Sequence, residues 1–254
     1  RYDLRYLRRA FEHTLRGYTG VVVVRSTVRP ETCAYLARRY DVRVVFHPEF
    51  LSARTATEDA YRPPSILLGN VNVPSRPFSI LREWYARLFP TVRVRITNAT
   101  TAETIKCATN AVAAVKIQTF NVVYQLCQSL GISYEDVRGG MLENGWIHPQ
   151  HTRVPGTDGH VSFGGACLPK DLAAFVGAIE ETCPRNGGRS IFRAALCARD
   201  GQRGCDRTQN NRIQRQQHRI PQCVTHERND GINDDGCYDD RYDDRYYDSH
   251  DDTR

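Results

Sequence analysis

Residues 101–131 have the sequence TAETIKCATNAVAAVKIQTFNVVYQLCQSLG, and this stretch decides the fold. Its apolar side chains recur at helical spacing from Ile105 to Leu126. Thr100 and Glu103 have the spacing of a capping box, which predicts a helix start there, and Gly131 supplies a stop signal. A helix of about thirty residues would be about 45 Å long. We expect such a helix to join subdomains or to form a subunit interface.

Short apolar runs precede this helix, at residues 21–24, 42–46, 65–68 and 92–96, and helical spacing fills the segments between them. Short unbroken strands that alternate with helices indicate a parallel sheet covered on both faces. The sequence therefore predicts an α/β fold. Its parallel sheet lies in residues 1–97, and an all-α domain with one long helix occupies residues 98–182.

The segment after the long helix changes in character. A second helix is predicted to begin at Ser133, and a short third helix at Asp171. Residues 183–254 lack hydrophobic periodicity and include an Asp-Tyr-Arg repeat at 239–247. Such a segment buries too little apolar surface to offset its ordering entropy, so residues 183–254 are predicted to be a disordered tail.

The net charge of +6 raises the question of nucleic-acid binding. Only three of the 35 basic residues are lysines, and the arginines form no single stripe interleaved with aromatic residues, which argues against it. An arginine-rich nucleic-acid binder acting through residues 185–219 is kept as a minor alternative. No apolar run approaches the roughly 20 residues that span a bilayer. We therefore expect a soluble, cytoplasmic protein.

The nine cysteines are scattered, and no two of them have CxxC spacing. This pattern predicts free thiols in a reducing compartment and no metal site. One cysteine stands out, in the run FGGACLPKD of residues 163–171. Two glycines precede Cys167, and a cation and a carboxylate, Lys170 and Asp171, follow it. Most lone cysteines are small buried hydrophobes, but a thiol beside a helix start and a cation is placed as a nucleophile.

Three further groups of residues could bind a ligand. Lys106 and Asn110 are four residues apart, so they share one face of the long helix and could hold an oxyanion. The run HPEFL (residues 47–51) follows one predicted strand, and STV (residues 26–28) follows the strand before it. Open α/β sheets bind ligands at these carboxyl ends of their strands.

These blocks, in this order, resemble the UDP-glucose/GDP-mannose dehydrogenase family, to which the UDP-glucose 6-dehydrogenases belong. They are residues 26–28, 47–51, 101–110 and 163–171, and the resemblance covers about residues 3–180. It implies part of a Rossmann-like NAD-binding domain in residues 1–97. It also implies a central helical domain in residues 98–182 that forms a homodimer through the long helix. Residues 151–159 resemble the substrate loop of a bacterial-type branch.

The resemblance implies a two-step oxidation of UDP-glucose, or a related UDP- or GDP-hexose, to its uronate with NAD, as in polysaccharide biosynthesis. Cys167 would capture the aldehyde as a thiohemiacetal and then carry a thioester. Lys106 and Asn110 would stabilise oxyanions, Asp171 would orient or activate water, and Glu49 and Thr27 would serve the acid–base and water network. Substrate binding is implied for Glu49, Phe50, Leu51, Lys106, Asn110, Asp158, Gly159, Phe163 and Gly164. Cofactor binding is implied for Ser26, Thr27, Cys167 and Lys170.

The chain departs from the family pattern in three respects. No GxGxxG run occurs in residues 1–254, Ala53-Arg54 stands where the family has a carboxylate–glycine pair, and the tail stands where a C-terminal nucleotide-binding domain is expected. One interpretation is an enzyme of this family that is impaired in this chain, and we expect the chain to bind NAD poorly and to turn over little or no substrate. The other is a non-catalytic remnant that acts as a dimerising interaction module.

Overall fold

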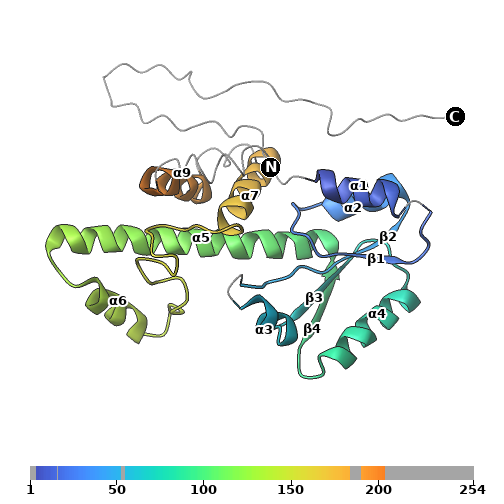
Figure 1. The fold of residues 1–254 in the computed structure, drawn as a ribbon, viewed down its shortest axis with the longest axis horizontal. Coiled ribbons are helices and arrows are strands. Elements are labelled where there is room, and N and C mark those ends of the chain that lie inside the picture. Colours follow the sequence, from blue (N-terminus) through green and yellow to red (C-terminus); the bar gives the residue numbers. More distant parts are fainter. Residues whose placement is uncertain (1–3, 16, 53–54, 184–189, 204–254) are drawn as a thin grey trace, which may run out of the picture. The chain divides into compact units, whose positions relative to one another are not determined.

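The molecule combines a four-stranded sheet with a long helix, α5, as shown in Figure 1. A computed structural model describes residues 4–15, 17–52, 55–183 and 190–203. The strands are β1 (Val21–Val24), β2 (Arg43–Phe46), β3 (Ile66–Asn70) and β4 (Val94–Asn98), in the order β1-β2-β3-β4. Within the described ranges, no helix has both the length and the apolar character needed to cross a membrane.

The strand pairing differs from the prediction of a wholly parallel sheet. β1 pairs in parallel with β2, and β3 with β4, but β2 and β3 are antiparallel through Val45–Asn70 and Phe46–Gly69. The apolar runs predict strands buried on both faces, but burial carries no information about strand direction. Between β2 and β3, residues 47–52 have no regular secondary structure, and the six-residue helix α3 (Ala56–Tyr61) is the only helix among the described residues there. The prediction of an all-parallel sheet is therefore wrong at this pair.

Helices cover both faces of the sheet, as predicted. α1 (Arg5–His13), α2 (Thr32–Tyr40) and the start of α5 pack on one face, where Val44 and Phe46 point. α4 (Ser75–Leu88) covers the other face, where Val45 points. Consecutive residues of β2 thus enter opposite cores, as the two-residue period of a strand requires.

Helix α5 (Ala99–Leu130) follows β4 directly and begins earlier than predicted. Its N-cap is Asn98, whose side chain accepts a hydrogen bond from the Thr101 backbone N–H at 2.8 Å. The predicted capping box of Thr100 and Glu103 is therefore wrong. The stop at Gly131 is confirmed, since this residue ends α5 with a positive φ of 66°.

Close packing joins the start of α5 to the sheet at Gly69 of β3. A Cβ atom at Gly69 would lie 2.7 Å from the Ala102 Cβ and 2.8 Å from the Ala99 Cα. Any larger side chain would push the helix away from the strand. The small residues at these positions therefore set how closely α5 approaches the sheet.

Glu103 ties α5 to the start of α2. Its side chain is fully buried, and its two carboxylate oxygens accept the backbone N–H groups of Glu31 at 2.7 Å and Cys33 at 2.8 Å. Both donors lie at the N-terminus of α2, which has unpaired N–H groups and a positive dipole end. Glu103 thus caps a helix distant in sequence, which explains why its local spacing to Thr100 is misleading.

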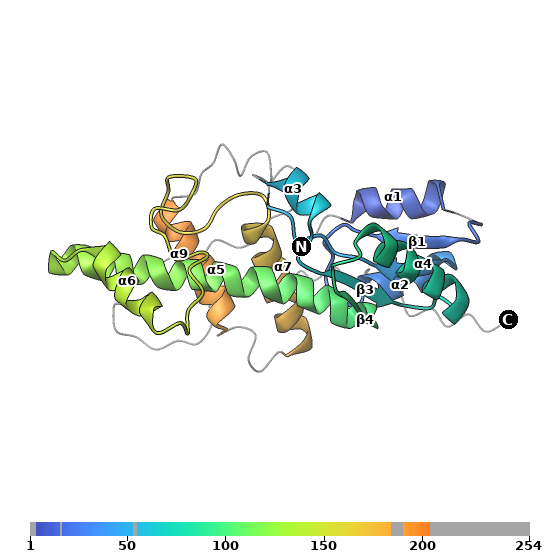
Figure 2. The ribbon, with the colours of Figure 1, turned by 90° about the horizontal axis from the view of Figure 1, so that it is seen from below.

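The remaining helices lie along α5, as both Figure 1 and Figure 2 show. α6 (Tyr134–Glu143) begins after Ser133, whose hydroxyl accepts from the Asp136 N–H, as predicted. α7 (Leu168–Thr182) begins three residues earlier than the predicted start at Asp171. Cys167 is its N-cap residue, and Pro169 fits the first turn, where a missing N–H is tolerated.

A helix within the predicted tail corrects the expected boundary at residue 183. α9 (Ile191–Arg203) packs against α5 and α7, with Phe192, Ala195 and Leu196 directed into their shared core. The rings of Phe175 and Phe192 meet edge to face, 5.1 Å apart. Polar residues, including three arginines, interrupt the apolar residues of α9, so the sequence pattern did not indicate this short apolar stripe. Residues 204–254, with the repeat at 239–247, lie outside the described residues.

The position of Glu103 predicts an unusual pH dependence of stability. Burial raises its pKa from 4.5 to about 7, against the lowering effect of the Cys33 and Glu31 donors. Because folding raises this pKa, the stability linked to Glu103 is present at acid pH and is lost as the pH rises through about 7. An increase of one unit in this pKa corresponds to about 1.4 kcal/mol in the free-energy difference between the two protonation states. The free energy of unfolding in urea, compared between the wild type and Glu103→Gln, should therefore show a wild-type advantage that narrows from pH 5 to pH 8.

The matched control is Glu83→Gln, because Glu83 is exposed on α4. Its difference from the wild type should stay constant over the same pH range. A wild-type advantage over Glu103→Gln that widens towards pH 8 would contradict the dominance of burial at this carboxyl.

Candidate active site

Lys106 is a buried cation on the inner face of α5. Its side chain is 4% exposed, and its Nζ lies 3.7 Å from Glu49 Oε1 and 5.0 Å from the centre of the Phe50 ring. Glu49 also accepts the Leu51 N–H at 2.7 Å through its second carboxylate oxygen. The structure thus brings the HPEFL run after β2 onto α5, and Glu49, Phe50 and Lys106 meet as one cluster.

A second cluster forms one helical turn further along α5. Asn110 Nδ2 donates a hydrogen bond of 2.5 Å to Asp171 Oδ2, and Lys170 pairs with the other carboxylate oxygen. Asp171 itself is 1% exposed. An amide and a cation therefore fix both oxygens of a buried carboxylate.

Cys167 is attached directly to this second cluster. It precedes the first turn of α7, and its carbonyl accepts the Asp171 N–H at 2.9 Å. The cysteine is exposed, so its thiol is accessible to a reactant. Among the cysteines of the described residues, Cys33, Cys107 and Cys127 are buried, as expected of small apolar side chains.

The spacing of Lys106 and Asn110 links the two clusters. One turn of an α-helix rises about 5.4 Å, so a cation and an amide project from adjacent turns of α5. Glu49 and Phe50 lie beside the cation, and the α7 start with Cys167 lies beside the amide. The arrangement can bind and polarise a small oxygenated group next to an accessible thiol.

The loop after β1 is held against the same helices. The Cys107 thiol donates to the Val28 carbonyl at 3.2 Å, and Arg29 forms an ion pair of 2.6 Å with Glu181 of α7. Ser26 is exposed and Thr27 is half-buried on this loop. These two predicted residues thus lie at the carboxyl end of β1, and neither belongs to the Lys106 or the Asp171 cluster.

A pocket of about 190 Å³ lies beside the HPEFL run. Its lining includes His47, Glu49, Phe50 and Leu51, which the sequence indicates, and Arg25 and Tyr85, which it does not. Tyr85 belongs to the apolar pattern of α4, so only its place in the fold shows that it reaches a pocket.

The imidazole of His47 lines this pocket and is uncharged at neutral pH. Burial, together with the nearby Arg25, lowers its pKa to about 4. Its Nδ1 donates to the Leu67 carbonyl at 3.1 Å, which leaves Nε2 as an acceptor. The ring also meets Tyr85 edge to face at 4.7 Å. His47 therefore contributes shape and a hydrogen-bond acceptor at neutral pH, and not positive charge.

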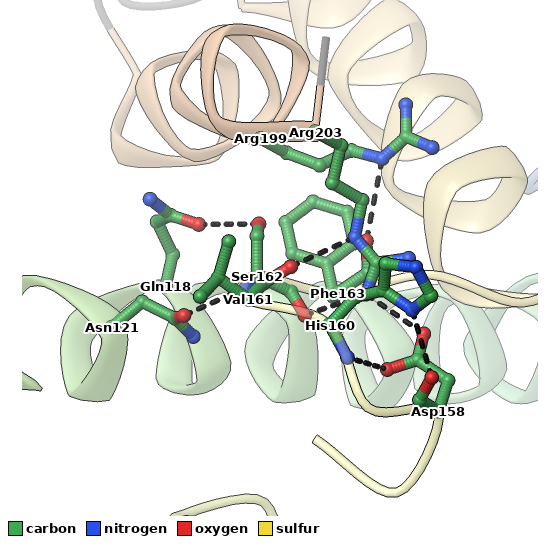
Figure 3. A network of polar contacts seen from close by, with 9 residues as sticks. All are labelled: Gln118, Asn121, Asp158, His160, Val161, Ser162, Phe163, Arg199 and Arg203. Atoms are coloured by element: carbon green, nitrogen blue, oxygen red, sulfur yellow. Dashed lines mark hydrogen bonds and ion pairs between the residues drawn. The ribbon is translucent and has the colours of Figure 1, made fainter. Parts of the chain in front are cut away.

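The predicted substrate residues of the loop before Cys167 are engaged with the protein itself. Asp158 forms an ion pair of 2.8 Å with Arg203 (Figure 3). The Phe163 ring is buried in a core that includes Ala111 and Leu172. Gly159 forms a turn at φ 75°, its N–H donating to the Gly156 carbonyl at 3.0 Å. The side chains of Asp158 and Phe163 are thus committed to structural contacts.

The two positions before Cys167, residues 164 and 165, require glycine for different structural reasons. A Cβ atom on Gly164 would lie 2.2 Å from Arg203 Nη1. Gly165 has a φ of 76°, a backbone conformation that residues other than glycine rarely adopt. The close neighbour that excludes a side chain at Gly164 is therefore an arginine of α9.

The described residues provide some of the hydrogen-bond donors that a phosphate-bearing dinucleotide needs. The hydroxyl groups of Ser26 and Thr27 and the ammonium of Lys170 can bind anionic or hydroxyl-bearing ligand groups. Ala53 and Arg54, which depart from the expected carboxylate–glycine pair, lie outside the described residues. No group of three or more histidine, cysteine or acidic side chains in the described ranges could hold a metal ion.

Comparisons with known proteins find matches for both the sheet region and the helical region of the chain. Residues 1–89 match the NAD binding domain of the UDP-glucose/GDP-mannose dehydrogenase family, and residues 100–186 match the central domain of the same family. The UDP-glucose 6-dehydrogenase of Rickettsia conorii is 34% identical over 188 residues, which are 70% of this chain and 41% of that protein. The protein of the same name from Rhizobium meliloti is 34% identical over 186 residues, 68% of this chain and 41% of that protein.

A solved structure shows the same fold. The UDP-glucose dehydrogenase from the archaeon Pyrobaculum islandicum superposes with a TM-score of 0.68 at 27% identity, covering 83% of this chain and 49% of that one. The chain therefore spans about two fifths of the length of the curated relatives and about half of this structure.

Proposed function

Because the chain belongs to the UDP-glucose/GDP-mannose dehydrogenase family, we propose that it oxidises C6 of a nucleotide sugar twice, from alcohol to carboxylate. The proposed substrate is UDP-glucose or a related UDP- or GDP-hexose. The observation that carries the proposal is the cluster around adjacent turns of α5, where Lys106 and the Asn110–Asp171 pair lie beside the start of α7 and its accessible Cys167.

In the first oxidation, the C6 hydroxyl loses a proton and a hydride and becomes an aldehyde. NAD⁺ supplies the hydride acceptor when bound, with Ser26, Thr27 and Lys170 as the residues that would contact it. Glu49, through the water network that it shares with Thr27, receives the proton. Lys106 stabilises the negative charge that develops on the oxygen, and this effect is strong because Lys106 is withdrawn from water.

In the second oxidation, the Cys167 thiol loses its proton to solvent, and its sulfur forms a bond to the aldehyde carbon. The carbonyl electron pair moves to oxygen, where Lys106 and Asn110 stabilise it in the thiohemiacetal. Loss of a second hydride from C6 would convert this adduct into a thioester, and a second bound NAD⁺ would supply the acceptor for that hydride. Water, oriented by Asp171, then adds to the thioester carbon, the C–S bond breaks, and the uronate and the free thiol are released.

Substrate binding is proposed for Phe50 and Leu51 beside Glu49 and for the loop that contains Asp158, Gly159, Phe163 and Gly164. Phe50 and Leu51 line the pocket next to the Lys106 cluster. In the loop, the side chains of Asp158 and Phe163 are committed elsewhere, so backbone groups are the available contacts.

Replacement of Cys167 tests this function. In Cys167→Ser, the weaker nucleophile should lower uronate formation from UDP-glucose at least about 100-fold. Uronate is measured by chromatography after reaction with excess NAD⁺, at high enzyme concentration because a chain without a GxGxxG run is expected to turn over slowly.

The matched control is Cys183→Ser. Cys183 is also exposed and lies at the opposite end of the same helix, α7. It should leave uronate formation unchanged. Equal rates in the wild type and Cys167→Ser would rule out the thiohemiacetal route.

The exposed apolar face of α5 supports a second proposal, which is homodimerisation through this helix. Val112, Val122, Leu126 and Leu130 are between 56% and 61% exposed, although they are large apolar side chains. A row of such residues on one helix is typical of a protein–protein contact. Dimerisation would persist in a chain that is not catalytically active, so it also serves the alternative of an interaction module.

Light scattering coupled to gel filtration tests this contact. The wild type should have the mass of a dimer, and Leu126→Asp should have the mass of a monomer because a carboxylate would be buried at the contact. Leu88→Asp on α4, where Leu88 is 51% exposed, should leave the mass unchanged. A monomeric wild type at micromolar concentration would refute the proposal.

A further inference from the structure

We propose that Arg203, the last residue of α9, is a positioning residue that fixes the loop of residues 156–165 for nucleotide-sugar binding. The proposal rests on the proposed function for the identity of the ligand. Its structural part, that α9 orders the loop before Cys167, stands on the contacts alone.

The Arg203 guanidinium is matched to three acceptors on the loop. Its Nε donates to the Val161 carbonyl at 2.9 Å, and its Nη2 donates to the Ser162 carbonyl at 2.9 Å and to Asp158 Oδ2 at 2.8 Å. Figure 3 shows the side chain reaching from α9 into the curve of the loop. A planar fork of N–H donors can bind several acceptors at once, whereas an ammonium is a single point charge.

A second arginine on α9 extends this contact by one loop residue. Arg199, one helical turn before Arg203, donates from Nε to the Phe163 carbonyl at 3.3 Å. Three consecutive loop carbonyls are therefore bound by two arginines of one helix face. The ion pair with Asp158 contributes little by itself because the Asp158 side chain is 43% exposed, so the carbonyl contacts carry the constraint.

Ser162 shows that the loop is held from the opposite side as well. Its N–H donates to Asn121 Oδ1 and its hydroxyl to Gln118 Oε1, both at 2.7 Å and both on α5. Gln118 also contacts α9, because its Nε2 donates a hydrogen bond to Gln202 Oε1 at 2.8 Å. The loop is thus clamped between α5 and α9.

The backbone at Ser162 is in a conformation that needs such a clamp. Its φ is 62°, in the left-handed region that few residues other than glycine adopt. Strained positions of this kind persist when the surroundings over-determine them, and they cluster at ligand-binding sites. Gly164 completes the fit, because a side chain there would displace the Arg203 guanidinium.

The functional consequence falls on binding more than on chemistry. The Cys167 position is fixed by α7 and by the Asn110–Asp171 contact, neither of which involves the Arg203 side chain. Loss of Arg203 should therefore leave the thiol in place but allow the preceding loop to move. Substrate binding would then bear the entropy of ordering the loop.

Hydrogen–deuterium exchange tests the structural part without any ligand. Arg203→Met keeps the aliphatic stem and removes the donors, so peptides covering residues 156–165 should exchange at least about 10-fold faster than in the wild type. Arg203→Lys should give intermediate protection. Arg193→Met is the matched control, because Arg193 joins α9 to Glu180 of α7 and does not contact the loop. It should leave exchange of the loop unchanged.

Steady-state kinetics with UDP-glucose test the functional part. Arg203→Met should raise KM about 10-fold while kcat stays within about twofold of the wild type, whereas Arg193→Met should change neither. A merely structural loss of folded protein would lower the apparent kcat and leave KM unchanged. If Arg203→Met does not fold, Arg203→Lys provides the same comparison.

The two proposals fail in different ways. Unchanged exchange in the folded Arg203 variants overturns the positioning role, even where the wild type oxidises UDP-glucose. Faster exchange with an unchanged KM overturns the role in substrate binding. A wild type that neither binds nor oxidises any nucleotide sugar refutes the proposed function, while the exchange result still decides whether α9 orders the loop.

Discussion

A row of polar side chains along α5 holds the rest of the structure in place. At spacings of three, four and eight residues, they bind segments that are distant in the sequence: Glu103 the start of α2, Lys106 the run after β2, Asn110 the start of α7, and Gln118 and Asn121 the loop before Cys167. Four of these side chains are buried and that of Asn110 is half-buried, and an unpaired buried donor or acceptor costs about 1–3 kcal/mol. The segments can therefore occupy few alternative positions relative to the helix.

The same constraint explains how the chemistry could be arranged. Lys106 and Asn110 lie on adjacent turns of one rigid helix, so the separation between a buried cation and an amide is set by helix geometry and not by loops. Asp171 is fixed by contacts on both of its oxygens, and Cys167 precedes the first turn of the helix that carries Asp171. Sites that are built on helices in this way keep their groups in place before a reactant arrives.

Local signals in the sequence predict much of this fold. The apolar runs locate all four strands of the sheet, and Gly131 and Ser133 mark the end of α5 and the start of α6. The antiparallel pair β2–β3 could not be predicted, because buried strands have the same composition in either direction. The role of Glu103 was missed because its partners are about 70 residues away in sequence, and α9 was missed because arginines interrupt its apolar residues.

The candidate site shows the same division. The residues that contact one another along α5, such as Lys106 with Glu49, were singled out by their types and spacing. The attachment of Asp158 and Gly164 to Arg203 depends on how α9 packs, which no local pattern records. Likewise, Tyr85 reaches the pocket only because α4 covers that face of the sheet.

The stoichiometry of the reaction tests the central claim most directly. With UDP-glucose limiting and NAD⁺ in excess, the reaction is followed to its end point, so that a low turnover rate does not affect the ratio. The proposed route through a thioester at Cys167 predicts two NADH and one UDP-glucuronate for each UDP-glucose consumed. One NADH with accumulation of an aldehyde, or no NADH at any enzyme concentration, would contradict it.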